Sequence, residues 1–154
     1  SKIGVLYPIQ TFSKTKKIDF KKIPIAIEGN TTGVLHTLMI LAKSLSGKVI
    51  EMNSIQRTTL HMAAIFACNF TNHLYHIADE ILQKQDLSFD LLRPLIAETA
   101  EKVQKYNPSD VQTGPAIRGD QAILNKHIEL LKNNPSVLEL YQNLSQRIIH
   151  SKKY

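Results

Sequence analysis

The spacing of apolar residues changes near residue 50, and this change divides the chain into two parts. Before it, three short runs rich in β-branched residues are typical of strands, at 3–6, 23–27 and 48–51. The segment 31–45 has a helical pattern that ends at Ser46-Gly47, where the glycine can close the helix. This order of elements predicts an α/β layer.

The segment 53–154 is predicted to be helical throughout. A cap at Asn53 or Ser54 begins an unusually long helix without proline or glycine, and Pro94 predicts a kinked or offset start to the next one. Asn134, which proline follows, caps the last helix. The expected helices are 54–84, 88–106, one that follows the 112–120 segment and ends near 132, and 134–150.

These patterns predict a mainly α fold in which an all-helical domain, 53–154, follows a short α/β part, 1–52. Three strands and one helix cannot bury both faces of a layer. Because the chain also starts at Ser1 without a methionine, we expect the α/β part to be the remnant of a larger sheet.

Composition excludes several classes of protein. No apolar run approaches the ~20 residues needed to span a bilayer, and no secretory signal is visible. The single cysteine, Cys68, excludes an intramolecular disulfide and fits a reducing, cytoplasmic setting. The net charge is +6, but the lysines gather in an expected loop and at the C-terminus without a recognition element. We therefore expect neither nucleic acid nor a membrane as a partner.

A polar stripe follows the long helix. At 100° per residue its members share about a third of the circumference, and they are Arg57, His61, Cys68, Asn69, Asn72 and His76. The stripe lacks the lysine and glutamate typical of an exposed face. It either pairs inside a helix or dimer interface, or it lines a site where His61 transfers a proton and Asn69 orients a carbonyl.

Two further segments carry candidate binding residues. Gln10, Thr11 and Ser13 follow the first strand, and ligands of α/β sheets gather at the carboxyl ends of strands. Local turn hydrogen bonds would explain the same residues equally well.

The second segment is a turn at 113–120 that contains Gly114-Pro115. Its candidates for substrate contact are Thr113, Arg118 and Asp120. In the alternative interpretation, Arg118 and Asp120 pair with each other or cap a helix to fix the turn.

Two kinds of site are not expected. His73, His76, Asp79 and Glu80 have helical spacing but lack a third strong ligand at a fixed interval, so we expect no metal site. No Gly-x-Gly-x-x-Gly follows a strand, so the chain itself is not expected to bind a dinucleotide.

Several motifs occur together in a fixed order. They are Tyr7-Pro-Ile-Gln-Thr-Phe-Ser13, Ile-Glu-Gly29, Arg57-x-x-x-His61-x-Ala-Ala-x-Phe-x-Cys-Asn69-Phe, Thr113-Gly-Pro-x-x-Arg-Gly-Asp120 and His127. The set resembles the C-terminal domain of the Rossmann-like proteins of domain of unknown function 2520, often described as NADP oxidoreductases.

The resemblance implies that 1–52 is the end of a Rossmann-type sheet and that NADP binds a domain ahead of Ser1. The helical domain would be similar to those of phosphogluconate dehydrogenase and pyrroline-carboxylate reductase relatives, which form the homodimer and close the substrate cleft. By motif match the resemblance carries over the site residues Gln10, Thr11, Ser13, His61, Asn69, Thr113, Arg118 and Asp120.

Two functions follow from this. In the first, the intact protein is an NADP-dependent oxidoreductase, and hydride transfer to a small substrate takes place in a cleft roofed by His61, Asn69 and Arg118, the arginine drawing an anionic group. In the second, the chain is a non-catalytic dimerisation or ligand-sensing module. A polar stripe that opens onto a pocket shared with Gln10 and Arg118 would favour the first function.

Overall fold

The computed structural model describes residues 1–12 and 17–151, so the candidate Ser13 lies outside the described residues. The chain forms two compact units, Ser1–Asn72 (unit 1) and His73–Tyr154 (unit 2). The predicted domain boundary after residue 52 stays a prediction.

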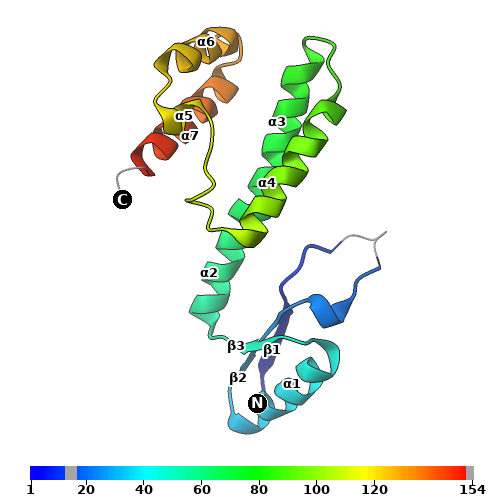
Figure 1. Cartoon of the computed structure of the whole chain (residues 1–154). Helices are drawn as coiled ribbons and strands as arrows, with labels where there is room; N and C mark the ends of the chain where they lie inside the picture. Colours follow the sequence, from blue (N-terminus) through cyan, green and yellow to red (C-terminus); the bar gives the residue numbers. More distant parts are fainter. Residues whose placement is uncertain (13–16, 152–154) are drawn as a thin grey trace. The chain divides into compact units, whose positions relative to one another are not determined.

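Unit 1 contains a three-stranded sheet of β1 (Gly4–Pro8), β2 (Ile25–Gly29) and β3 (Val49–Glu51) in the order β1-β2-β3. β1 runs antiparallel to β2, and β3 runs parallel to β2 (Figure 1). A short 3₁₀ turn, η1 (Phe20–Lys22), precedes β2. All three strands were predicted, with boundaries that differ by one or two residues.

One face of the sheet is covered by α1 (Thr32–Leu45). Ile25 and Ile27 of β2 are fully buried together with Ala42 of α1. The partly buried residues packed against them are Leu6, Leu35, Leu38, Met39 and Val49. Side chains alternate along a strand, so the neighbours of Leu6 and Ile27, namely Tyr7 and Glu28, belong to the opposite face.

α1 ends at the predicted position but without the predicted glycine cap. Its C-cap is Ser46, whose backbone is extended (φ −124°), and Gly47 does not adopt the positive φ of a glycine cap. The Ser46 side chain is buried instead, and its hydroxyl donates to the carbonyl of Ile23 (2.5 Å) and accepts from the amide of Lys48 (3.0 Å). The helix therefore ends on a serine that joins the starts of two strands.

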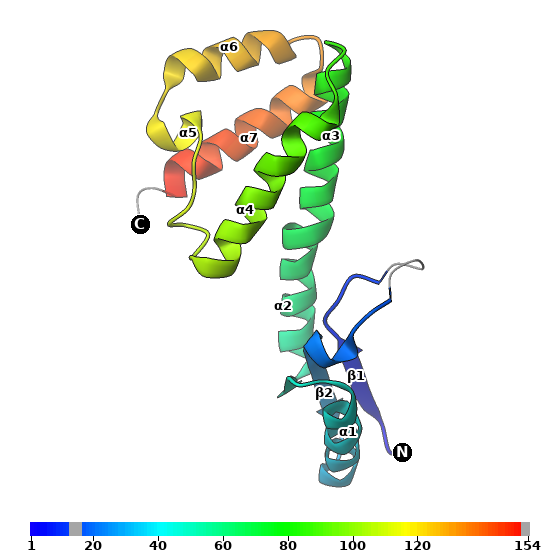
Figure 2. The same cartoon turned by 45° about the vertical axis from the view of Figure 1, so that its right-hand side comes forward.

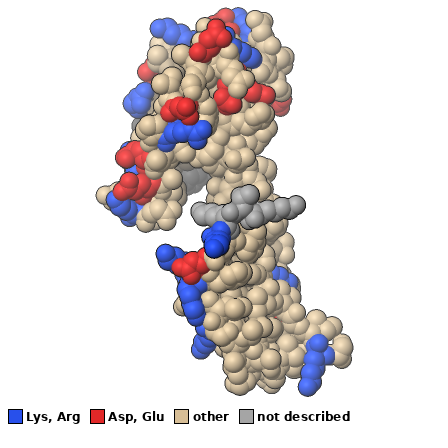
Figure 3. All heavy atoms as spheres, turned by 90° about the vertical axis from the view of Figure 1, so that its right-hand side faces the viewer, with Lys and Arg blue, Asp and Glu red and all other residues tan. Residues whose placement is uncertain are grey.

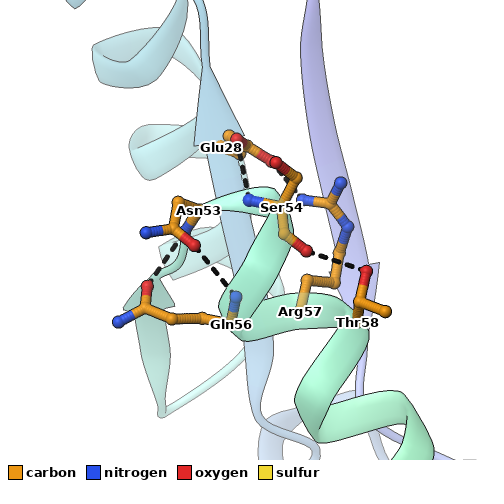
Figure 4. Close-up of polar contacts among 6 residues, drawn as sticks. All are labelled: Glu28, Asn53, Ser54, Gln56, Arg57 and Thr58. Atoms are coloured by element: carbon orange, nitrogen blue, oxygen red, sulfur yellow. Dashed lines mark hydrogen bonds and ion pairs between the residues drawn. The ribbon is translucent and has the colours of Figure 1, made fainter.

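The predicted long helix is confirmed in extent but not in geometry. It consists of α2 (Ser54–Ala64), the π-helical segment η2 (Ile65–Phe70) and α3 (Thr71–Gln83). Asn53 caps it, and a capping box joins Asn53 to Gln56 through hydrogen bonds of 2.9 and 3.0 Å (Figure 4). A π segment arises from one extra residue in a turn, which apolar spacing does not reveal.

Unit 2 is helical in its described residues. Pro94 lies in the first turn of α4, directly after a 3₁₀ turn, as the predicted offset required. α5 packs against both α6 and α7, which lie side by side (Figure 2). The buried apolar side chains are Ala116 and Leu124. The elements that follow α3 are η3 (Phe89–Leu92), α4 (Arg93–Lys105), α5 (Pro115–Arg118), α6 (Gln121–Leu131) and α7 (Pro135–Ser151).

The mainly α fold with a small sheet near the N-terminus is therefore confirmed. In the residues that the structure describes, no helix combines the length and the apolar character that a membrane span requires.

Candidate functional site

The start of α2 is attached to the sheet by Glu28 of β2. The carboxylate of Glu28 forms an ion pair with Arg57 and accepts a hydrogen bond from the backbone amide of Ser54 (3.1 Å; Figure 4). Because Glu28 belongs to the sheet face that α1 does not cover, this pair holds α2 against that face.

A second contact joins the sheet face that α1 does not cover to the side of α2 that carries Arg57. The hydroxyl of Tyr7 lies 3.3 Å from Nδ1 of His61. His61 follows Arg57 by four residues, which is about one helical turn, so both point to the same side of α2. The two contacts together set the direction of the His61 ring. Tyr7 was not predicted as a site residue, because its partnership depends on strand pairing that one sequence does not reveal.

A pocket of about 320 Å³ opens where β1 ends beside α2 and η2, and we call it the His61 pocket. Four predicted site residues meet in it, Gln10 and Thr11 from the segment after β1 and His61 and Asn69 from the helix. The other lining residues are Tyr7, Ile9, Ala64, Ile65 and Cys68. Three members of the polar stripe, His61, Cys68 and Asn69, thus line a pocket together with Gln10, and the expected contribution of Arg118 stays a prediction.

The π segment explains why Asn69 reaches the same pocket as His61. In a pure α-helix, residues eight apart differ in direction by about 80° at 100° per residue. The wider turn of a π segment, about 4.4 residues with i→i+5 bonding, advances each residue by about 80° instead and reduces that difference to roughly 10°. The hydroxyl of Thr71 donates to the carbonyl of Phe66 (3.2 Å), a bond that spans five residues.

Gln10 is oriented by its own turn. Its Oε1 accepts a hydrogen bond from the backbone amide of Thr11 (2.8 Å), and the backbone amide of Gln10 donates to the carbonyl of Pro8 (3.1 Å). The side-chain NH₂ group therefore remains as a donor for a ligand. The local turn interpretation is thus confirmed for Gln10, and the turn fixes a side chain that also lines the pocket, while the binding of a ligand there stays a prediction.

The second predicted segment lies in unit 2. Gly114 (φ 109°) precedes the first residue of α5 and Gly119 (φ 73°) follows the last one. Both adopt the positive φ that glycine tolerates and other residues rarely adopt. The carboxylate of Asp120 accepts from the amide of Ile123 (3.2 Å) and caps α6, as the alternative interpretation expected.

The remaining candidates of that segment are exposed. Arg118 is the last residue of α5, and no carboxylate of the described residues lies within ion-pair distance of it. Thr113, which lies before the start of α5, is exposed as well, and its carbonyl accepts from the side chain of Gln112 (3.0 Å). Their contact with a substrate stays a prediction.

No group of three or more His, Cys, Asp or Glu side chains is arranged to hold a metal ion among residues 1–12 and 17–151. His76, the last member of the polar stripe, lies 3.4 Å from Glu80 one turn later, and both side chains are exposed.

Comparison with known proteins gives one family and two informative structures. The family model described as "Domain of unknown function (DUF2520)" matches residues 23–148. The structure of the putative NADP oxidoreductase BF3122 from Bacteroides fragilis is 46% identical, with a TM-score of 0.91, over 97% of this chain and 58% of that one. No curated protein matches the chain.

Protein TM1727 from Thermotoga maritima shares the fold, with 22% identity and a TM-score of 0.80 over 98% of this chain and 63% of that one. The chain thus spans about three fifths of the length of either protein. The family match covers most of the chain, including every predicted site residue beyond the first thirteen. The chain therefore belongs to the family named Domain of unknown function (DUF2520).

Proposed function

We propose that the intact protein is an NADP-dependent oxidoreductase of the cytoplasm, and that this chain supplies the part of its active site that binds a small substrate. The observation that carries the proposal is the His61 pocket, which joins polar side chains from the end of a strand and from the facing helix. Its volume of about 320 Å³ lies at the lower end of the range for small-molecule sites.

The polar residues of the pocket have distinct roles in this proposal. Tyr7 engages Nδ1 of His61, so Nε2 is the ring nitrogen available to exchange a proton with a substrate carbonyl or imine. Asn69 offers a carboxamide that orients the same group. The NH₂ of Gln10 and the hydroxyl of Thr11 add donors at the opposite wall.

The residues of this chain do not themselves fit a dinucleotide. The glycine-rich turn that would hold its pyrophosphate is absent from the sequence. NADP would therefore bind to a Rossmann-type domain outside this chain, and the description of the Bacteroides fragilis protein supports the choice of NADP.

We also propose that Arg118 draws an anionic group of the substrate, with Thr113 beside it. The exposed guanidinium, with no ion-pair partner among the described residues, is suited to carboxylate or phosphate. In this proposal Asp120 has a structural role, because its carboxylate caps α6.

The same long helix would form a homodimer. Met62, Phe66 and Phe70 recur every four residues of α2 and η2, none of them lines the His61 pocket, and they are 56%, 64% and 49% exposed. An apolar row of this kind is typical of an interface. A Phe66→Gln variant should shift the sedimentation of the chain from dimer to monomer; a monomeric parent chain would contradict the dimer.

The oxidoreductase is tested by NADPH oxidation with the intact protein and a panel of small keto acids and imines. With an active substrate, His61→Gln and Asn69→Ala should each lower kcat, the histidine variant by about 100-fold or more. His36→Gln is the matched control, because His36 is exposed on α1 and does not line the pocket.

Absence of turnover together with absence of nucleotide binding would refute the oxidoreductase and leave the ligand-sensing module. Turnover that survives His61→Gln at the level of the control would keep the enzyme but remove its catalysis from this pocket.

A further inference from the structure

A second pocket lies beside the His61 pocket within unit 1, and we call it the lysine pocket. Its volume is about 350 Å³, and Lys17 and Lys22 line it together with Asp19. Gln10 and Thr11 line both pockets, so the two pockets adjoin at one short segment. An elongated ligand with one end in each pocket would pass this segment.

Hydrogen-bond donors dominate the polar groups of the lysine pocket. The Oε1 atom of Gln10 already accepts the amide of Thr11, which leaves the NH₂ group as the donating end of that side chain. The two lysines contribute ammonium groups, which only donate. A group that accepts several hydrogen bonds and carries negative charge is complementary to this set.

Among the described residues that line the lysine pocket, Asp19 is the one carboxylate, and it is already engaged. Its Oδ1 accepts from the amide of Lys21 (3.1 Å) and caps η1, while Oδ2 lies 3.8 Å from Nζ of Lys22. The described lining thus holds two lysines and one carboxylate, and the local charge is positive. Figure 3 shows blue side chains with a few red atoms among them on the lower half of the view, where unit 1 lies.

Lys21 provides a contrast within the same segment. Its ammonium donates to the carbonyl of Ser44 (2.8 Å), and the residue does not line the pocket. Three lysines in six residues therefore have different tasks, since one fastens η1 to the end of α1 and the other two line the pocket.

We propose that the lysine pocket binds a terminal oxyanion, carboxylate or phosphate, of the substrate whose reacting carbonyl or imine occupies the His61 pocket. The substrate is then a short, elongated molecule with the reacting group at one end and this anion at the other, and the group proposed for Arg118 would be a separate one. That the bound molecule is a substrate rests on the proposed oxidoreductase, whereas the anion site itself does not.

The test is a titration of the 154-residue chain with inorganic phosphate and, separately, with acetate at low ionic strength, followed by amide NMR signals. Either anion should shift the signals of Gln10, Thr11 and Lys17, and the tighter binder identifies phosphate or carboxylate as the preferred group. The double variant Lys17→Gln/Lys22→Gln should bind about tenfold more weakly, because it loses two charge-assisted contacts.

Lys43→Gln/Lys48→Gln is the charge-matched control, because it removes two exposed lysines that do not line the pocket, and it should bind as the parent chain does. Asp19→Asn retains a capping oxygen while removing the competing charge, so it should tighten binding several-fold. The proposal is overturned if neither anion shifts these signals, if Lys17→Gln/Lys22→Gln binds as tightly as the control, or if Asp19→Asn weakens binding. NADPH turnover does not enter this test, so an inactive protein with lysine-dependent anion binding would refute the oxidoreductase alone.

Discussion

The ion pair between Glu28 and Arg57 attaches α2 to the sheet, and a double-mutant cycle on this pair measures how firmly. Two unit charges 4 Å apart attract by about 4 kcal/mol at an effective dielectric constant of about 20. The side chains are 32% and 25% exposed, so water, desolvation and lost side-chain freedom offset most of this attraction. We expect a coupling free energy of about 1–2 kcal/mol, above the range for fully exposed pairs.

The cycle consists of Glu28→Gln, Arg57→Gln and the double variant. Since the chain has two compact units, a single unfolding curve can mix two transitions. Amide hydrogen exchange of the buried strand β2 reports the opening of unit 1 by itself, and it gives the free energy for each variant.

A coupling below about 0.3 kcal/mol, within the usual error of additivity, would refute the reasoning. The ion pair would then not hold α2, and the direction of His61 would depend on Tyr7 and the capping box. A coupling that survives 1 M salt at more than half its value would in turn support a pair that is shielded from solvent ions.

Two further outcomes are expected in unit 2. Asp120→Ala removes the cap of α6 and should lower the free energy of unfolding of this unit by about 1 kcal/mol, whereas Asp120→Asn should retain most of it; equal losses in a urea titration would contradict capping. The hydrogen bond and the charge of Arg93 hold the pKa of the Asp90 carboxyl below its usual value of 3.8. The stabilisation from this contact is therefore present above the unfolded pKa and is lost as the pH falls through the folded one. Arg93→Gln should raise the pKa of Asp90 in an NMR titration, and an unchanged midpoint would contradict that cause.

The elements of the fold could be predicted from local signals. The strands have β-branched runs, the side chain of Asn53 caps the long helix, and the side chain of Ser88 caps η3. The carbonyl of Asn134 accepts a backbone bond from Leu138 at the start of α7. Each of these signals involves residues within a few positions of each other. The predicted glycine cap after α1 was wrong, because the buried hydroxyl of Ser46 satisfies the backbone groups there.

The site could be predicted only in part, for a physical reason. His61 and Asn69 were found by helical spacing, and Gln10 and Thr11 by their place after a strand. Tyr7 was missed because its contact with His61 spans 54 positions and requires the pairing of β1 with β2. Asp120 caps α6, which was one of its two predicted interpretations, and its contact with a substrate stays a prediction.

The π segment makes the His61 pocket depend on how the helix winds as well as on which residues it contains. Removal of Ala67, which is exposed, would let Ile65–Phe70 rewind as an ordinary α-helix. Asn69 would then follow His61 by seven residues, and seven steps of 100° leave it about 20° from the direction of His61. A rewinding that kept all the residues would instead turn Asn69 away by about 80°. The wider turn and the extra residue therefore compensate for each other, and the loss of either one without the other would separate Asn69 from His61.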